Sequence, residues 1–126
     1  MNEKYINILK EIEKLDFLSS KNKQLYKGDI ITNPPYKFAS EFILKGLSLL
    51  PKGNQLALFM PIRYLSGQKR GEIFKKYPPK IIYVASKRFV CSKNGDFTHN
   101  RAALMDYAWF IWEKGFKGKT TVDWFN

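Results

Sequence analysis

The segment 29–36, Asp-Ile-Ile-Thr-Asn-Pro-Pro-Tyr, constrains the fold of this chain more than any other stretch. Ile30 and Ile31 are apolar and β-branched and follow a turn-like Lys-Gly-Asp, which predicts a short buried strand. Asn33 then stands at the carboxyl end of that strand. Two successive prolines have a fixed φ and no N–H to donate, so the chain must leave the sheet in a defined direction. Because ligands bind at the carboxyl ends of strands in open α/β sheets, we expect a rigid binding loop here.

The residue types in this loop suit a planar base that carries an exocyclic amine. The N6 amine of adenine is a poor nucleophile because its lone pair is delocalised into the ring. Two acceptors on its hydrogens, Asn33 Oδ1 and the Pro34 carbonyl, would favour a pyramidal nitrogen with its lone pair directed at an electrophile. Tyr36 would stack on the base after it leaves the duplex. The alternative is a proline-rich turn that only ends a strand.

Residues 32–36, Thr-Asn-Pro-Pro-Tyr, resemble the NPPY catalytic motif of the amino-group DNA methyltransferases, in particular the adenine-N6 class. Residues 68–70 with 74–80, residues 83–88 and residues 107–115 are similar to the downstream half of phage-type and restriction-associated adenine methylases. The resemblance runs from about residue 29 to the end of the sequence. It therefore covers a catalytic half and not the whole family domain.

This resemblance implies transfer of a methyl group from S-adenosylmethionine to a flipped adenine in DNA. It assigns catalysis to the matching positions Asn33, Pro34, Pro35 and Tyr36. In the resembled family an aromatic residue before the last hairpin strand packs on the flipped base. Phe89 occupies a similar place in this sequence, so it is a second candidate for base stacking beside Tyr36.

The apolar pattern predicts an α/β fold. It indicates strands at 29–32, 55–60, 80–85 and 105–112, and helices at 38–50 and 62–77, the second of them interrupted by Gly67 and Gly71. The order strand, helix, strand, helix, strand predicts a parallel sheet with right-handed crossovers. The resemblance adds that the strand at 105–112 inserts antiparallel. We expect a partial Rossmann-like methyltransferase sheet of about four strands with flanking helices, and the 29–32 strand at one edge.

The remaining segments complete a single truncated methyltransferase-like domain, residues 1–126. Residues 1–28 predict an amphipathic helix at 3–15 and a basic loop, and residues 29–126 form the catalytic-half sheet. Residues 86–104 predict a long polar loop, which is usually functional or mobile. Residues 120–125 are expected to form an edge strand or a docked peptide.

The charge balance favours a polyanionic partner. The chain has 22 Lys and Arg against 11 Asp and Glu, a net charge of +11, and a sequence pI near 9.8. DNA is the partner expected, although a lysine-rich solvated surface has the same composition. Six basic residues are candidates for nucleic-acid contacts: Arg63, Lys69, Arg70, Lys87, Arg88 and Arg101.

Other classes of protein and site are disfavoured. No apolar run approaches the length of a membrane span and no signal-like segment opens the chain, so we expect a soluble protein without a membrane partner. A single cysteine, Cys91, allows no intrachain disulfide and predicts cytoplasmic residence. His99 is the only histidine, and with Cys91 it does not make a zinc site, so no metal is expected.

Two further groups of residues have ordinary structural interpretations. The aromatic residues Trp109, Phe110 and Trp112 lie in a predicted strand and are expected in the core. Asp106 and Glu113 are expected to pair with surface lysines rather than act as an acid and a base.

One expected feature of the resembled family is missing from the sequence. The eight glycines never occur as Gly-x-Gly, so no glycine-rich loop can cradle S-adenosylmethionine, and weak binding or none is expected. Three interpretations follow: a fragment or remnant, one half of a split enzyme, or a small protein that reuses the fold for binding. The functions to compare are therefore a methyltransferase half completed by a partner, a non-catalytic nucleic-acid or protein-binding module such as a mobile-element inhibitor, and an inert remnant. A homodimer or a complementary methyltransferase half is the expected assembly.

Overall fold

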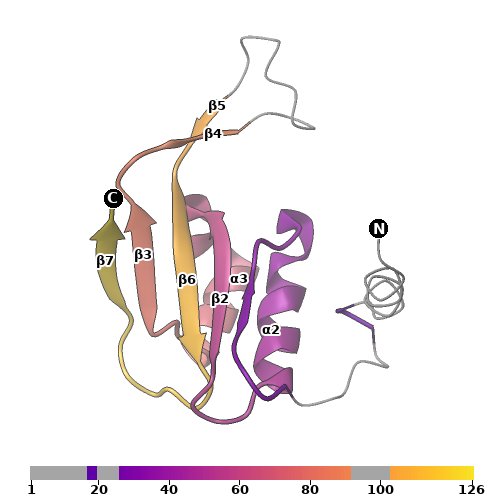
Figure 1. Cartoon of the computed structure of the whole chain (residues 1–126). Helices are drawn as coiled ribbons and strands as arrows, with labels where there is room; N and C mark the ends of the chain where they lie inside the picture. Colours follow the sequence, from indigo (N-terminus) through magenta and orange to yellow (C-terminus); the bar gives the residue numbers. More distant parts are fainter. Residues whose placement is uncertain (1–16, 20–25, 92–102) are drawn as a thin grey trace, which may run out of the picture.

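The computed structural model describes residues 17–19, 26–91 and 103–126. Its main feature is a five-stranded sheet with the order β1-β2-β6-β3-β7 (Figure 1). The strands are β1 (Ile30–Thr32), β2 (Gln55–Pro61), β3 (Ile81–Ala85), β6 (Tyr107–Glu113) and β7 (Thr121–Phe125). The expected partial Rossmann-like α/β class is confirmed, with one strand more than the four expected.

Strand directions agree with the mixed sheet that was expected. Strand β1 is parallel to β2 and β3 is parallel to β7, while β6 is antiparallel to both β2 and β3. The C-terminal ends of four strands, β1, β2, β3 and β7, therefore lie along the same end of the sheet, where β6 begins. Among the described strands β1 pairs only with β2, so its predicted edge position is confirmed. Strand β7 forms the other edge, which resolves the choice left open for the C-terminal segment.

The helical segments are η1 (Tyr36–Phe38), α2 (Ala39–Leu49), η2 (Ile62–Leu65) and α3 (Gln68–Lys76). The helical segment predicted at 62–77, with interruptions at Gly67 and Gly71, is confirmed at Gly67 and wrong at Gly71. Gly67 separates η2 from α3 with φ of 113°, a left-handed conformation that no helix continues through. Gly71 lies inside α3, where its N–H donates to the Gly67 carbonyl, so only the first of the two glycines interrupts the helix.

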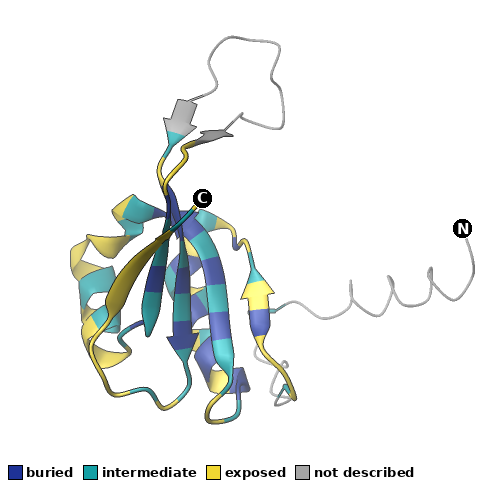
Figure 2. Ribbon diagram, turned by 60° about the vertical axis from the view of Figure 1, so that its left-hand side comes forward, coloured by how far each residue is buried: buried dark blue, intermediate teal, exposed yellow. Residues whose placement is uncertain are grey.

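The core lies between the sheet and the two α-helices. Alternate residues Leu56, Leu58 and Met60 of β2 are fully buried, as the period of two in a strand requires. From β6, Phe110 and Trp112 point to the same side and are also buried. Helices α2 and α3 both cover this face, and Figure 2 shows them behind the strands.

Phe74 of α3 packs against both buried aromatic rings of β6. Its ring centroid lies 6.2 Å from that of Phe110 and 6.1 Å from that of Trp112. The indole N–H of Trp112 donates to the carbonyl of Tyr77 at 2.9 Å, so the one polar atom of this side chain is satisfied. The predicted core positions of Phe110 and Trp112 are confirmed.

The segment expected to be a polar loop at 86–104 is not a loop at its two ends. Strands β4 (Phe89–Cys91) and β5 (Ala103–Met105) pair antiparallel in a separate ribbon. Both are short apolar runs, and their mutual pairing satisfies backbone groups that a loop would leave to water. Asp106 then separates β5 from β6, so the single strand predicted at 105–112 is divided. The ribbon extends beyond the end of the sheet at which β3 ends and β6 begins (Figure 1).

Some predictions lie outside the described residues. These are the helix at 3–15, most of the basic loop before β1, and the positions of His99 and Arg101. Within the described ranges, no helix combines the length and the apolar composition needed to cross a membrane.

Candidate functional site

The loop after β1 is held in a defined conformation. Pro34 is buried while Asn33 and Pro35 are exposed. Pro35 has φ of −60° and ψ of 121°, and its carbonyl accepts a hydrogen bond from the Phe38 N–H at 2.9 Å. These contacts fix the turn into η1 and place Asn33 at the carboxyl end of β1.

Two acceptors in this loop have no partner within the part of the chain that the structure describes. Neither the Asn33 side chain nor the Pro34 carbonyl takes part in a hydrogen bond there. Each can therefore accept a hydrogen bond from a ligand without losing an existing one.

Asn33 lines a shallow hollow of about 310 Å³ on the face of the sheet that α2 and α3 do not cover. The other lining residues are aromatic: Phe59 from β2, Trp109 from β6 and Phe125 from β7. The rings of Phe59 and Trp109 are 4.9 Å apart between centroids, so they form a continuous apolar floor. Trp109 is half-buried here and does not belong to the core, which corrects its predicted position.

Tyr36 is held by neighbouring rings and not by the loop alone. Its ring centroid lies 5.8 Å from that of Tyr64 in an edge-on arrangement and 6.2 Å from that of Tyr107. The ring of Tyr107 stacks on Phe59 at 4.9 Å with an interplanar angle of 8°. An aromatic chain therefore joins Tyr36 to the floor of the hollow beside Asn33.

Two of the predicted nucleic-acid contacts converge on this cluster. The guanidinium carbons of Arg63 and Arg70 lie 5.6 Å and 4.6 Å from the centroid of the Tyr64 ring. Arg70 Nε also donates to the Ser66 carbonyl at 2.9 Å. Because Tyr64 contacts Tyr36, these two arginines lie one aromatic ring away from Tyr36 in the Asn33 loop.

The other predicted basic residues are spread around the molecule. Lys69 lies 3.9 Å from the Glu41 carboxylate, and both side chains are largely exposed. Lys87 is exposed next to the base of the ribbon. Arg88 pairs with Asp106 at 2.9 Å, also with both partners exposed. Such pairs contribute little to stability, about 0–1 kcal/mol, and leave these cations accessible.

Other predicted pairs and side chains have mixed outcomes. Glu113 pairs with Lys80 at 3.2 Å, as expected, whereas the partner of Asp106 is an arginine and not a lysine. Phe89 lies in β4, but the placement of its side chain is outside what the structure describes, so its stacking role stays a prediction.

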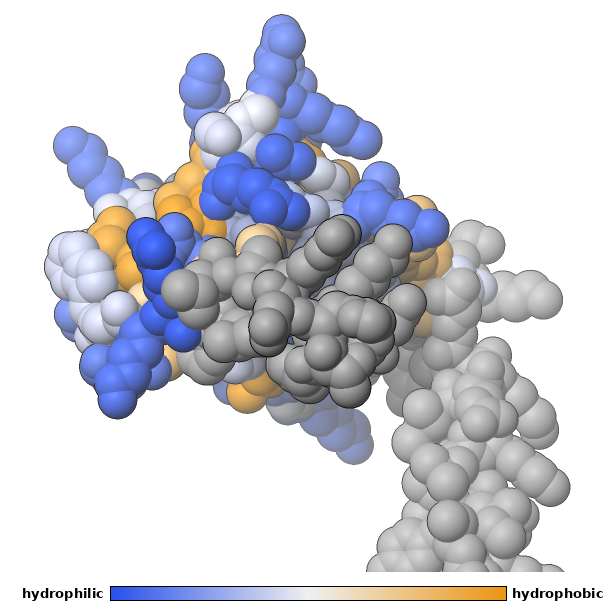
Figure 3. Space-filling view, turned by 90° about the horizontal axis from the view of Figure 1, so that it is seen from above, coloured by the Kyte–Doolittle hydropathy of each residue, from blue (hydrophilic) through white to orange (hydrophobic). Residues whose placement is uncertain are grey.

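Figure 3 looks down on the end of the sheet at which strands β1, β2, β3 and β7 terminate. Hydrophilic residues stand around smaller apolar areas on this view. The hollow itself combines the polar side chain of Asn33 with an aromatic lining, and ligand sites typically combine apolar contact area with a few polar groups that fix orientation.

Sequence reasoning missed the aromatic walls of this site. Phe59 and Trp109 pair across β2 and β6, and Phe125 enters from the edge strand β7. The alternation along β2 places Phe59 on the opposite face from Leu58, which was a usable signal. The pairing of β2 with β6 was not readable from the pattern of either strand.

No protein-family model matches the sequence, and no curated protein matches it. Among solved structures, the fold is similar to that in the crystal structure of the M1.HpyAVI–SAM complex, with a TM-score of 0.41 and 15% sequence identity. The similarity covers 94% of this chain, which spans 63% of the length of that protein. At this identity the likeness concerns the fold alone.

Proposed function

We propose that this chain is the target-base-binding and catalytic half of a DNA adenine-N6 methyltransferase and acts when a partner completes it. The observation that supports this most is a pair of acceptors without a partner among the described residues, the Pro34 carbonyl and the Oδ1 of Asn33, which lines an aromatic hollow. An adenine presents two N–H hydrogens and a flat apolar ring, which match these two features.

Binding of a flipped adenine requires both the aromatic stacking surface and the two hydrogen-bond acceptors. A flipped base loses its stacking and pairing at a cost of a few kcal/mol. Stacking on an aromatic ring returns about 1–3 kcal/mol. Hydrogen bonds return about 0.5–1.5 kcal/mol each. Tyr36 or the Phe59 and Trp109 floor therefore supplies most of the affinity, while Asn33 and Pro34 supply the preference for an exocyclic amine.

The charge of the chain positions the duplex. Arg63 and Arg70 lie beside Tyr64, one ring away from Tyr36, where phosphates flanking an extruded base would pass. Contacts of this kind fix register and orientation without reading sequence. Lys69, Lys87 and Arg88 extend the basic surface over α3 and the base of the ribbon. Arg101 lies outside the described residues, and its contact with nucleic acid stays a proposal.

We assign the methyl donor to the partner, because the described residues do not fit S-adenosylmethionine. A donor cradle of the resembled kind uses free backbone amides of a glycine-rich loop at a helix N-terminus; the eight glycines form no Gly-x-Gly, and Pro34 and Pro35 have no amide to offer. In the next loop, the space where a Cβ would stand on Gly67 is filled by the Arg70 guanidinium at 2.8 Å. Calorimetric titration of the isolated chain with S-adenosylmethionine is expected to show no binding tighter than ~10 μM. Tighter binding would place the donor site within this chain.

Binding to duplexes with one bulged nucleotide tests the proposed base site. We expect the chain to bind a bulged adenine more tightly than a bulged thymine in the same sequence, measured by fluorescence anisotropy. Asn33→Ala should reduce the ratio of the affinities for bulged adenine and bulged thymine about tenfold, equivalent to about 1.4 kcal/mol. Asn33→Asp keeps an acceptor oxygen and should retain part of the preference. Equal affinity of the unmodified chain for both bulges would reject the assignment of Asn33 and Pro34.

The missing donor cradle favours one second candidate, a non-catalytic nucleic-acid-binding module such as an inhibitor from a mobile element. Such a module would use the same basic surface and aromatic rings. It would bind bulged and paired DNA alike, and Asn33→Ala would leave its affinity unchanged. The experiment with bulged duplexes therefore distinguishes the two candidate functions in the isolated chain, without the partner protein.

A further inference from the structure

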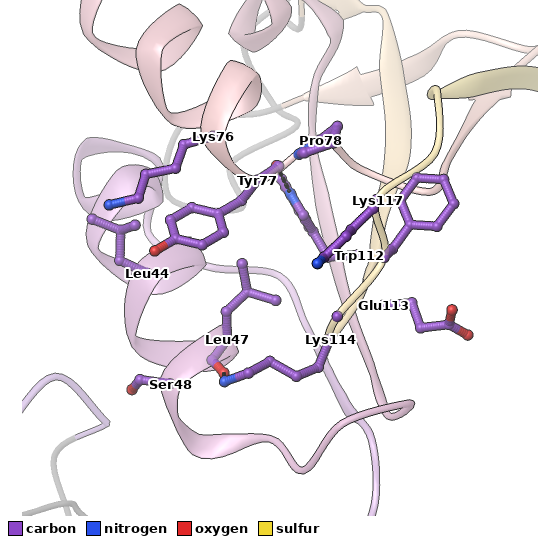
Figure 4. A pocket seen from close by; sticks show the side chains of 12 residues that line it. Leu44, Leu47, Ser48, Lys76, Tyr77, Pro78, Trp112, Glu113, Lys114 and Lys117 are labelled. Carbon is purple, nitrogen blue, oxygen red and sulfur yellow. Dashed lines mark hydrogen bonds between the residues drawn. The ribbon is translucent and has the colours of Figure 1, made fainter.

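A second, larger cavity lies beside the C-terminal end of β6, at the end of the sheet opposite to Asn33. It has a volume of about 540 Å³ and opens between the C-terminal parts of α2 and α3 and the turn that follows β6 (Figure 4). This volume is within the roughly 300–1,000 Å³ typical of small-molecule sites. The base-binding proposal uses none of its residues.

The walls of this cavity are apolar and partly aromatic. Leu44 and Tyr77 remain 45% and 38% exposed, unusually open positions for large apolar side chains that face a hollow. Trp112 forms the inner wall and is held in place by its hydrogen bond to the Tyr77 carbonyl. A flat ring can therefore enter beside a rigid indole and a tyrosine ring.

Three lysines surround the apolar walls: Lys76, Lys114 and Lys117. Lys114 Nζ donates to the Leu47 carbonyl near the end of α2, which anchors that ammonium at the cavity. Lys76 Nζ lies 5.4 Å from the Tyr77 ring centroid. Lys117 makes no ion pair with any residue that the structure describes.

The single acidic residue lining the cavity does not cancel this charge. Glu113 is paired with Lys80 at 3.2 Å. Its negative charge is therefore already compensated by a lysine that does not line the cavity. The three lining lysines leave the site cationic, and a cationic apolar cavity selects ligands that are both flat and negatively charged.

We propose that this cavity binds a small organic anion, a flat apolar ring that carries a sulfonate, carboxylate or phosphate group. The ring packs between Leu44, Tyr77 and Trp112. The acidic group lies next to Lys117 and the anchored Lys114. The site acts independently of the Asn33 loop, since the two lie at opposite ends of the strands of the sheet and share no lining residue.

Naphthalene-2-sulfonate is a suitable probe, followed by two-dimensional amide NMR of the full chain. We expect saturable shifts at the Trp112 indole N–H and at the backbone amides of Lys114 and Gly115. The neutral naphthalene-2-sulfonamide has the same ring, so it should bind at least about tenfold more weakly if one charge-assisted hydrogen bond is lost. Shifts that do not saturate, or equal binding of both compounds, would overturn the proposal.

A matched pair of variants localises the charge. Lys117→Gln should weaken sulfonate binding by about fivefold to tenfold, whereas Lys119→Gln, an exposed lysine that does not line the cavity, should leave it unchanged. Both substitutions are on the surface, so the unbound spectra should match that of the unmodified chain. Equal weakening by the two variants would indicate attraction by net charge alone and would also overturn the site.

Discussion

The two faces of the central sheet contain similar residues and have different roles. On the face under α2 and α3, Trp112 of β6 is 1% exposed and belongs to the core. Three positions earlier on the same strand, Trp109 faces the other side and lines the hollow beside Asn33. The difference is in what covers each face. Among the described residues only the first has helices packed on it, so identical side chains are core on one face and a candidate binding surface on the other.

The largest expected effect separates these two tryptophans. Trp112→Ala should lower the free energy of unfolding by about 3–5 kcal/mol, because it empties a packed core and leaves the Tyr77 carbonyl without its donor. Trp109→Ala should cost less than half as much, since its side chain is already partly in water. Urea denaturation monitored by circular dichroism measures both. Equal losses would mean that the open face is also a core.

A second, smaller effect concerns two helical glycines. A Cβ on Gly46 of α2 would stand 2.8 Å from a methyl carbon of Leu56, so Gly46→Ala should destabilise the fold by about 1–3 kcal/mol. Gly71 of α3 has nothing within 4 Å of that position. Gly71→Ala should instead stabilise the fold by about 0.5–1 kcal/mol. Opposite signs in thermal unfolding would confirm that Gly46 is packed tightly against the Leu56 side chain while Gly71 faces open space, whereas two losses would refute it.

The smallest effect on stability is expected at the edge of the open face. Ile31 is 70% exposed on β1, an edge strand with unpaired backbone groups, and we expect a second copy or a complementary half to cover it. Ile31→Lys should change the free energy of unfolding by less than about 0.5 kcal/mol. It should nevertheless reduce self-association measured by light scattering. A wild-type chain that stays monomeric at high concentration would exclude the homodimer and leave the complementary half.

Much of the fold could be predicted from the sequence, because each strand is a local run of apolar residues that can be identified without knowing its neighbours. A continuous apolar run that stops at Pro61 identified β2, and the apolar run before Asn33 identified β1 within one residue. Interruptions were expected at both Gly67 and Gly71, and only the one at Gly67 is present, because whether a glycine continues a helix depends on the φ it adopts. A sequence pattern does not distinguish these two outcomes.

Only part of the candidate site, the loop that contains Asn33 and Tyr36, could be predicted from the sequence, for a related reason. Asn33 and Tyr36 are neighbours along the chain, so their rigid loop was visible directly. Phe125 reaches the same hollow from the far edge of the sheet, through a strand whose pairing the sequence left open. Tyr64 joins Tyr36 to two arginines through a short η2 turn that was expected to be helix. Contacts that depend on pairing and on turn geometry require the structure.

Strand β6 comes late in the chain but lies between β2 and β3, and this has a consequence for synthesis. When β2 and β3 have left the ribosome, the strand that joins them does not yet exist, and each keeps a row of unpaired amides and carbonyls. Pairing over such sequence separations is slow and leaves apolar strands exposed meanwhile. A nascent chain halted before residue 107 lacks Phe110 and Trp112 as well as the central pairing. Such a chain is expected to aggregate or to need a chaperone until its last strands emerge.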